Sequence, residues 1–170
     1  MNEQANRLAT GSNPEAGAQG PVFQLQRVYL KDASLEMPHA PQIFLEQGTP
    51  QVDVQLDTTN DPVVEGVTEV VVRVTTTARI GEKVLFLIEA KQAGIFEMRG
   101  IPDTQMPAVL GIVCPGIIYP YLRANVADLL TRTGLPPIHL AEINFEALYQ
   151  QKMGQNAPGL VVPPASQTRQ

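Results

Sequence analysis

The 170-residue sequence is poor in the side chains from which most catalytic and metal sites are built. It contains two histidines and a single cysteine, Cys114, and its only serines are Ser12, Ser34 and Ser166. A nucleophilic triad needs a serine or cysteine beside a base and an orienting acid, and Ser34 lacks flanking glycines of the kind that form a nucleophile elbow. His39 and His139 lie near prolines with no second ligand at metal-binding spacing. The sequence therefore predicts a protein that is not an enzyme, with no catalytic residue, metal or cofactor.

The single cysteine also excludes an intramolecular disulfide, which is typical of proteins from a reducing compartment. Residues 1–21 are polar and lack the charged start and apolar run of a secretory signal peptide. We therefore expect a cytoplasmic protein.

Positive charge is scarce, because 12 basic residues stand against 17 acidic ones. With no basic stripe to neutralise phosphates, we expect no nucleic-acid partner. The acidic excess lies in residues 22–103, which hold 12 acidic and 7 basic side chains, whereas residues 104–152 hold three of each. Such charges form either a solvated sheet face or a docking surface for a basic partner. Composition leaves both interpretations open.

Long uninterrupted apolar runs are also missing. Between residues 105 and 127 the only charge is Arg123, but Pro107, Pro115, Gly116 and Pro120 break the stretch. Continuous membrane-spanning helices rarely contain so many breakers. We therefore expect a buried helix or a subunit interface here, and no direct membrane insertion.

Alternation of apolar and polar residues in the first half predicts an antiparallel sheet. Four strands are expected, over residues 23–37, 52–57, 68–78 and 83–93. The first should be long and bulged, because its register changes near Arg27. Residues 37–50 form a long connection, and turns are expected at 58–62 and 80–82. These short connections predict a meander of the last three strands.

The second half changes to a helical period. A short helix is expected from about residue 105 to 114, capped by Asp103 or Thr104, and a longer one with Pro120 in its first turn. The longer helix has an apolar stripe formed by Ile118, Leu122, Val126, Leu129 and Leu130. Asn144 should cap a last helix over 145–152. The prediction is one α+β domain over residues 22–152, with a disordered tail at 1–21 and a mobile tail at 153–170.

Two apolar groups suit a binding role. They are Val52, Val54 and Leu56 on a predicted strand, and Phe145, Leu148 and Tyr149 on the last helix. Most apolar stripes are core, so a core face closed by that helix is the simplest interpretation. A groove for extended chains is the alternative. A carrier of small apolar ligands and an enzyme of unfamiliar kind are further hypotheses. In the tail, the short Leu160-Val161-Val162 patch is expected to be unstructured.

Several separated motifs, in one order, resemble the SecB family of bacterial protein-export chaperones. The matching stretches cover about residues 22–152 and are FQLQRVYLKD at 23–32, EVVVRVT at 69–75, QAGIF at 92–96, GIPDTQM at 100–106, CPGIIYPYLR at 114–123 and PIHLAEINFEAL at 137–148.

The resemblance implies a four-stranded antiparallel sheet with helices packed on one side, and a homotetramer built as a dimer of dimers. It implies an ATP-independent holdase that keeps precursor proteins unfolded and delivers them to the export motor SecA. The positions similar to the family's SecA-binding residues are Asp32, Glu36, Leu87 and Glu89. The client groove would combine Val52, Val54 and Leu56 with the last helix, and Ile88, Ala90 and Gln92 resemble positions that affect assembly. A SecB-like chaperone that controls a toxin–antitoxin system is an alternative within the same fold.

Overall fold

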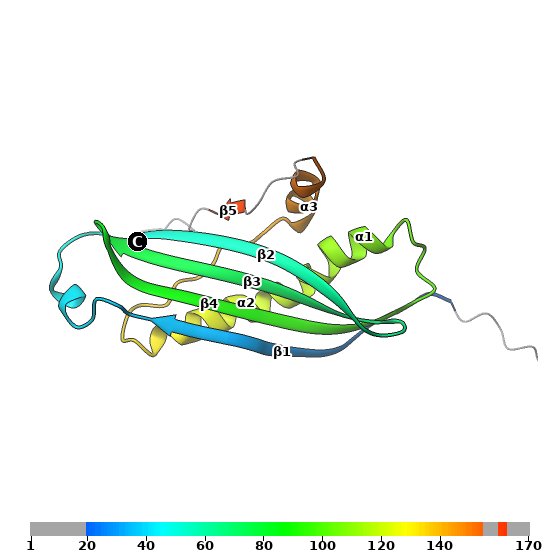
Figure 1. The fold of residues 1–170 in the computed structure, drawn as a ribbon, viewed down its shortest axis with the longest axis horizontal. Helices are drawn as coiled ribbons and strands as arrows, with labels where there is room; N and C mark the ends of the chain where they lie inside the picture. The colour runs from blue at the N-terminus through cyan, green and yellow to red at the C-terminus, as the bar shows by residue number, and fades with distance from the viewer. Residues whose placement is uncertain (1–19, 155–159, 163–170) are drawn as a thin grey trace, which may run out of the picture.

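Four long antiparallel strands form the body of the protein (Figure 1). The computed structural model describes residues 20–154 and 160–162, the last three as backbone only. The strands are β1 (Val22–Glu36), β2 (Gln51–Val64), β3 (Val67–Ile80) and β4 (Lys83–Arg99), in the sheet order β1-β4-β3-β2-β5. The predicted meander of β2, β3 and β4 is confirmed, and β1 joins it beside β4.

Strand β1 is irregular, as its sequence predicts. Its register against β4 shifts between Leu25 and Arg27 and again between Leu30 and Asp32. The connection to β2 contains a cis Ala40–Pro41 peptide and one short 3₁₀ helix, η1 (Gln42–Leu45), which sequence patterning did not reveal.

Two strands are longer than their sequences suggest. Residues 58–62 are not a turn, because β2 continues through them to Val64, paired with β3 as far as Val67. The reversal comes at Gly66, whose φ of +73° suits a glycine. Strand β4 likewise continues past Ala93 to Arg99. Cross-strand pairing with β3 overrides the turn preference of Asn60, Asp61 and Pro62.

The helical half also differs from the prediction. Residues 106–131 form one continuous helical segment, made of α1 (Met106–Ala108), the π-helical η2 (Val109–Val113) and α2 (Cys114–Thr131). Pro120 lies inside α2 and Pro115 occupies its first turn, so the helix starts earlier than expected. Neither Asp103 nor Thr104 caps it, since the residue before α1 is Gln105, which makes no side-chain cap bond.

Helix α2 packs on one face of the sheet, behind it in the view of Figure 1. Four members of the predicted stripe, Ile118, Leu122, Val126 and Leu130, are fully buried, and Leu129 is partly buried. Gly94 on β4 permits the close approach, because a Cβ there would lie 2.7 Å from Ile118 Cγ2. The helices therefore cover the sheet face that carries Phe86, Ile88 and Phe96.

Among the described residues, Met106–Thr131 is long and apolar enough to cross a membrane by length and composition alone, a test that core helices of soluble proteins also pass. Its sheet-facing side is part of the core. Only 33% of the 18-residue apolar stretch within it is buried, however. Much of the helix therefore faces away from the chain's own core.

Two elements follow. Helix α3 (Phe145–Gly154) is capped as predicted, with the Ala147 N–H donating to Asn144 Oδ1 at 3.0 Å. The segment Leu160–Val162 forms β5, antiparallel to β2. The expectation of an unstructured patch at residues 160–162 is therefore wrong. Residues 1–21 lie almost wholly outside the described part of the chain.

Candidate docking and client-binding surfaces

The four residues proposed as a docking face lie together on the sheet surface opposite α2. Across β1 and β4, Glu36 stands opposite Leu87 and Ser34 opposite Glu89, so these side chains share one face. Asp32 stands opposite Lys91 on the same face. Leu87 and Glu89 alternate with the buried Ile88 and Ala90, as the sequence predicts. We call Asp32, Glu36, Leu87 and Glu89 the docking face.

The docking face is less negative than its three carboxylates suggest. Arg73 Nη2 on β3 lies 2.8 Å from Glu89 Oε1, and Lys91 Nζ lies 3.6 Å from Asp32 Oδ2. Glu36 forms no ion pair within residues 20–154. The freely available negative charge of this face is therefore centred on Glu36, beside the partly exposed Leu87.

A second group of charged and polar side chains on the same face was not predicted from the sequence. The Glu69 carboxylate on β3 accepts hydrogen bonds from Lys31 Nζ and from the Tyr29 hydroxyl, and it is almost fully buried. These bonds, the one from Lys31 first, lower the pKa of Glu69 below its usual value. The group links β1 to β3 across β4, and its members are far apart in sequence.

The predicted client wall is not open. Val54 and Leu56 are 3% and 2% exposed and belong to the core, together with Phe145 and Leu148 of α3. Val52 is partly buried against them. The simpler interpretation, a core face closed by the last helix, therefore describes this structure. In the described structure, the side chains of Val54 and Leu56 are therefore not accessible at the surface.

Helix α3 is held at three places. Tyr149 lies over Gly111 of η2, so closely that a Cβ added at Gly111 would be 2.5 Å from Tyr149 Cδ2. Phe145 makes an edge-to-face contact with Tyr119, the centroids 5.5 Å apart. Lys152 Nζ lies 2.9 Å from Asp57 Oδ1 on β2. Burial alone would raise the pKa of Asp57, but hydrogen bonds from Lys152 and the Thr58 N–H outweigh it and lower that pKa.

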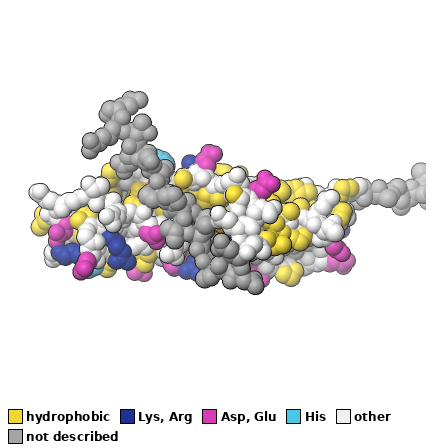
Figure 2. Space-filling model, turned by 90° about the horizontal axis from the view of Figure 1, so that it is seen from above, with side chains coloured by type: hydrophobic (Ala, Val, Ile, Leu, Met, Phe, Trp, Pro, Cys, Tyr) yellow, Lys and Arg dark blue, Asp and Glu magenta, His cyan; other side chains and the backbone are white. Residues whose placement is uncertain are grey.

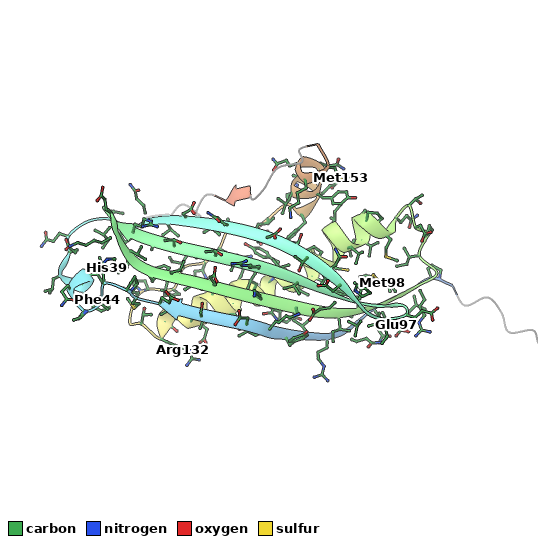
Figure 3. All side chains as sticks on the ribbon, viewed as in Figure 1. His39, Phe44, Glu97, Met98, Arg132 and Met153 are labelled. Carbon is green, nitrogen blue, oxygen red and sulfur yellow. The ribbon has the colours of Figure 1, made fainter. Side chains whose placement is uncertain are left out.

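Apolar side chains are exposed elsewhere. Among the described residues they occur on β1, in the β1–β2 connection, in the β2–β3 hairpin and on η2, α2 and α3: Phe23, Leu30, Phe44, Leu45, Val63, Val64, Val113, Tyr121 and Met153. Phe44 lies near His39 at one end of the sheet, and Met153 projects from α3 (Figure 3). Hydrophobic side chains also gather around α1 in the view from above (Figure 2). Most of these positions lie in connections or on outward helix faces, where alternation along a strand does not predict exposure; Phe23 and Leu30 lie on the irregular strand β1.

The three positions assigned to assembly are buried within the chain. Ile88, Ala90 and Gln92 are at most 2% exposed beneath α2. Gln92 accepts a hydrogen bond of 2.6 Å from the Asn125 side chain of that helix. They are therefore not exposed on the surface of the single chain.

No group of three potential metal ligands occurs in residues 20–154. Cys114 is buried, and burial raises the pKa of its thiol to about 12. A cleft of about 160 Å³ lies between α2 and the 142–145 segment, lined in part by Tyr119, Arg123 and Phe145. It is smaller than the pockets that usually hold drug-sized ligands.

Comparison with known proteins places these features in a family. A family model described as preprotein translocase subunit SecB matches residues 16–156. The protein-export protein SecB of Acidovorax sp. (strain JS42) is 61% identical over 137 residues, covering 81% of this chain and 91% of that protein. That of Bordetella pertussis is 52% identical over 170 residues, covering 94% and 97%. A Mycobacterium tuberculosis SecB-like chaperone, solved with an antitoxin peptide, shares the fold at a TM-score of 0.60 and 19% identity, over 71% of this chain and 90% of that one.

Proposed function

The chain belongs to the SecB family of protein-export chaperones, and from this premise we propose that it is an ATP-independent, cytoplasmic holdase that delivers unfolded precursors to SecA. The family match over residues 16–156 carries the proposal. Binding of unfolded chains by mass action needs no bond-breaking step, since any ligand of the unfolded state shifts the folding equilibrium toward it.

The docking face supports delivery to a basic partner. It combines the carboxylate of Glu36, which has no ion-pair partner among residues 20–154, with the partly exposed Leu87 on paired strands of the sheet. Charged groups around an apolar centre favour rapid, oriented association with a surface of opposite charge. The covering helices lie on the other side of the sheet, so a partner bound here leaves α3 and β2's outer edge accessible.

Clients would meet the exposed apolar side chains first. Phe44 and Leu45 in the β1–β2 connection, with Leu45 84% exposed, form such a contact site. The side chains of Val54 and Leu56 become available to a client when α3 moves away from them. Apolar side chains together with free strand backbone recognise extended chains without demanding one sequence. The peptide bound to the related M. tuberculosis chaperone supports a peptide-binding role for this fold.

Assembly as a homotetramer, a dimer of dimers, is supported by α2. In its middle, the side of this helix turned from the sheet carries Pro120, Tyr121 and Ala124, which are exposed and uncharged; the exposed Asp128 follows on the same side, near the end of the helix. A helix apolar on both sides is usually buried on both sides. Linking several weak binding sites would raise avidity for a long client by about 10²–10⁴-fold.

A refolding assay tests the function. A slow-folding precursor is diluted from denaturant with and without the chain, and its mature form, which folds fast, is the matched control. Because folding rates differ widely between chains, a holdase arrests the precursor and leaves the mature form alone. Unchanged refolding of the precursor at chaperone excess would refute the proposal. Added ATP should change nothing in the absence of SecA.

A further inference from the structure

The outer edge of β2 is occupied by a segment of the same chain. Strand β5 pairs antiparallel with β2, with Val162 opposite Val54, Val161 opposite Gln55 and Leu160 opposite Leu56. The opposite edge of β2 is paired with β3 along nearly its whole length. Within the described residues, β5 covers three of the 14 residues of β2 on the outer edge.

We propose that this edge is a strand-addition site for clients, and that residues 160–162 are a resident strand that an incoming client must displace. The proposal rests on the holdase function and names the chemistry of its site. The ligand class is an unfolded segment with several consecutive apolar residues that are not proline. Its backbone would bond β2 at the positions that β5 now holds.

The sequence limits how firmly the resident strand can bind. Pro158 precedes the apolar triplet, and Pro163 and Pro164 follow it. Proline has no N–H to donate to a ladder, so pairing beyond the triplet is disfavoured on both sides. A ladder of three residues is marginal by itself. The triplet follows α3 after five residues of sequence, and a segment of the same chain has an effective concentration of about millimolar at its pairing site.

The position of the resident strand explains why it would compete with clients for the edge of β2. It lies at Val54 and Leu56, two of the three residues of the predicted client wall. A longer client segment without proline can pair with more of β2 than three residues, and so displaces the shorter strand. A client that offers no such segment is excluded. An occupied edge also prevents pairing between the β2 edges of two copies, a common route to aggregation.

The consequence is a reduced apparent affinity, because clients bind only the fraction of molecules whose edge is open. Removing the resident strand should raise affinity by about two- to tenfold, the factor expected when a weak tethered segment occupies half to nine-tenths of the sites.

The test uses full-length variants. The double variant Val161→Pro, Val162→Pro removes two successive backbone N–H donors. Successive N–H groups of a strand point to opposite sides, so one of the two removed donors is the one that faces β2. The matched control, Ala165→Pro with Ser166→Pro, adds two prolines beyond β5. The probe is a reduced, carboxymethylated and fluorescently labelled lactalbumin, which stays unfolded. Its Kd should fall about two- to tenfold in the first variant and stay unchanged in the control, since only the first opens the edge.

Hydrogen exchange gives a second readout. Without client, the β2 amides at 54–56 should exchange faster in the Val161→Pro, Val162→Pro variant than in the control, and client should slow them in both. Equal Kd values in all three proteins would overturn the resident strand and leave the holdase function intact. If none of the three binds the unfolded probe, the holdase function itself fails, and the resident strand with it.

Discussion

At the scale of single residues, Cys114 reports on global opening. Its thiol is completely buried at the start of α2, and burial raises its pKa to about 12. Both effects suppress reaction, because the thiolate is the nucleophile and must be reached by the reagent. We expect no labelling by iodoacetamide at neutral pH under native conditions, and complete labelling in about 6 M guanidinium chloride, well beyond typical unfolding midpoints. Rapid labelling of the native protein would show that α2 leaves the sheet locally.

Glu69 is the second residue with a clear signature. Its folded-state pKa is lowered by Lys31 and Tyr29, so its stabilisation is complete above the unfolded pKa and disappears as pH falls through the folded pKa. Glu69→Gln should therefore lower the free energy of unfolding by about 1–2 kcal/mol at neutral pH. The difference from the parent should shrink once pH falls below about 4.3, the ordinary glutamate pKa.

Urea unfolding at neutral and acidic pH measures both effects. Glu65→Gln, at an exposed carboxyl in the β2–β3 turn, is the control and should show neither. A loss for Glu69→Gln that is the same at both pH values would mean that its ionised form is not what stabilises the fold.

At the scale of elements, two glycines predict how α3 is seated. A Cβ at Gly111 would lie 2.5 Å from Tyr149 Cδ2, whereas one at Gly116 would meet only Phe145 Cδ2, at 4.0 Å. Gly111→Ala should therefore push α3 outward and destabilise the chain by about 1–3 kcal/mol, the usual effect of overpacking. Gly116→Ala, the matched control, should be neutral or stabilising by up to about 1 kcal/mol, since alanine favours helix.

Proteolysis and hydrogen exchange of residues 145–154 would follow α3 directly. If Gly111→Ala raises client affinity while Gly116→Ala does not, α3 is one of the covers over Val54 and Leu56. Equal protection of α3 in both variants would show that Tyr149 adjusts without moving the helix.

The elements also show what the sequence can reveal. Alternation assigned Leu87 and Glu89 to one face and Ile88 to the other, because the period of a strand is fixed by its backbone geometry. Alternation alone left a covered core face and an open groove at Val54 and Leu56 as alternatives, since a strand pattern does not reveal what packs on it; the covered face was favoured only because most apolar stripes are core. The pairing of residues 160–162 was hidden for a related reason: three apolar residues are too few to carry a period. The helix start was missed because Pro120, a usual first-turn residue, is tolerated inside α2.

At the scale of the whole molecule, the outward side of α2 predicts assembly. Tyr121 is 51% exposed beside the uncharged Pro120 and Ala124, and a carboxylate placed there would have to be desolvated in an interface, at a cost of several kcal/mol. Tyr121→Asp should therefore lower the mass of the proposed tetramer, four chains of 18.5 kDa, toward that of two chains. Gln150→Asp, an exposed position on α3, is the control and should leave the mass unchanged. Analytical ultracentrifugation measures both, and a tetramer that persists in Tyr121→Asp at low concentration would place the interface elsewhere.

The last prediction concerns the docking face. Its ion pairs determine which carboxylate contributes most to SecA binding. Glu36 is unpaired in the described part of the chain, whereas Glu89 already has Arg73 as a partner at 2.8 Å. Glu36→Arg should therefore weaken SecA binding by at least tenfold, because it replaces an attraction by a repulsion next to Leu87. Glu65→Arg, in the β2–β3 turn, changes the net charge by the same amount as Glu36→Arg. It should reduce SecA affinity only slightly, because salt screens charges that lie far from the docking face.

Titration of SecA at two salt concentrations separates local from overall charge. The difference in SecA affinity between Glu36→Arg and Glu65→Arg should narrow in high salt. Binding of an unfolded client should stay constant in both variants, since the proposed client surface lies on the other side of the sheet and at its edge. If Glu36→Arg loses client and SecA binding together, the two surfaces are not separate, and the division of the molecule into a docking face and a covered client edge is wrong.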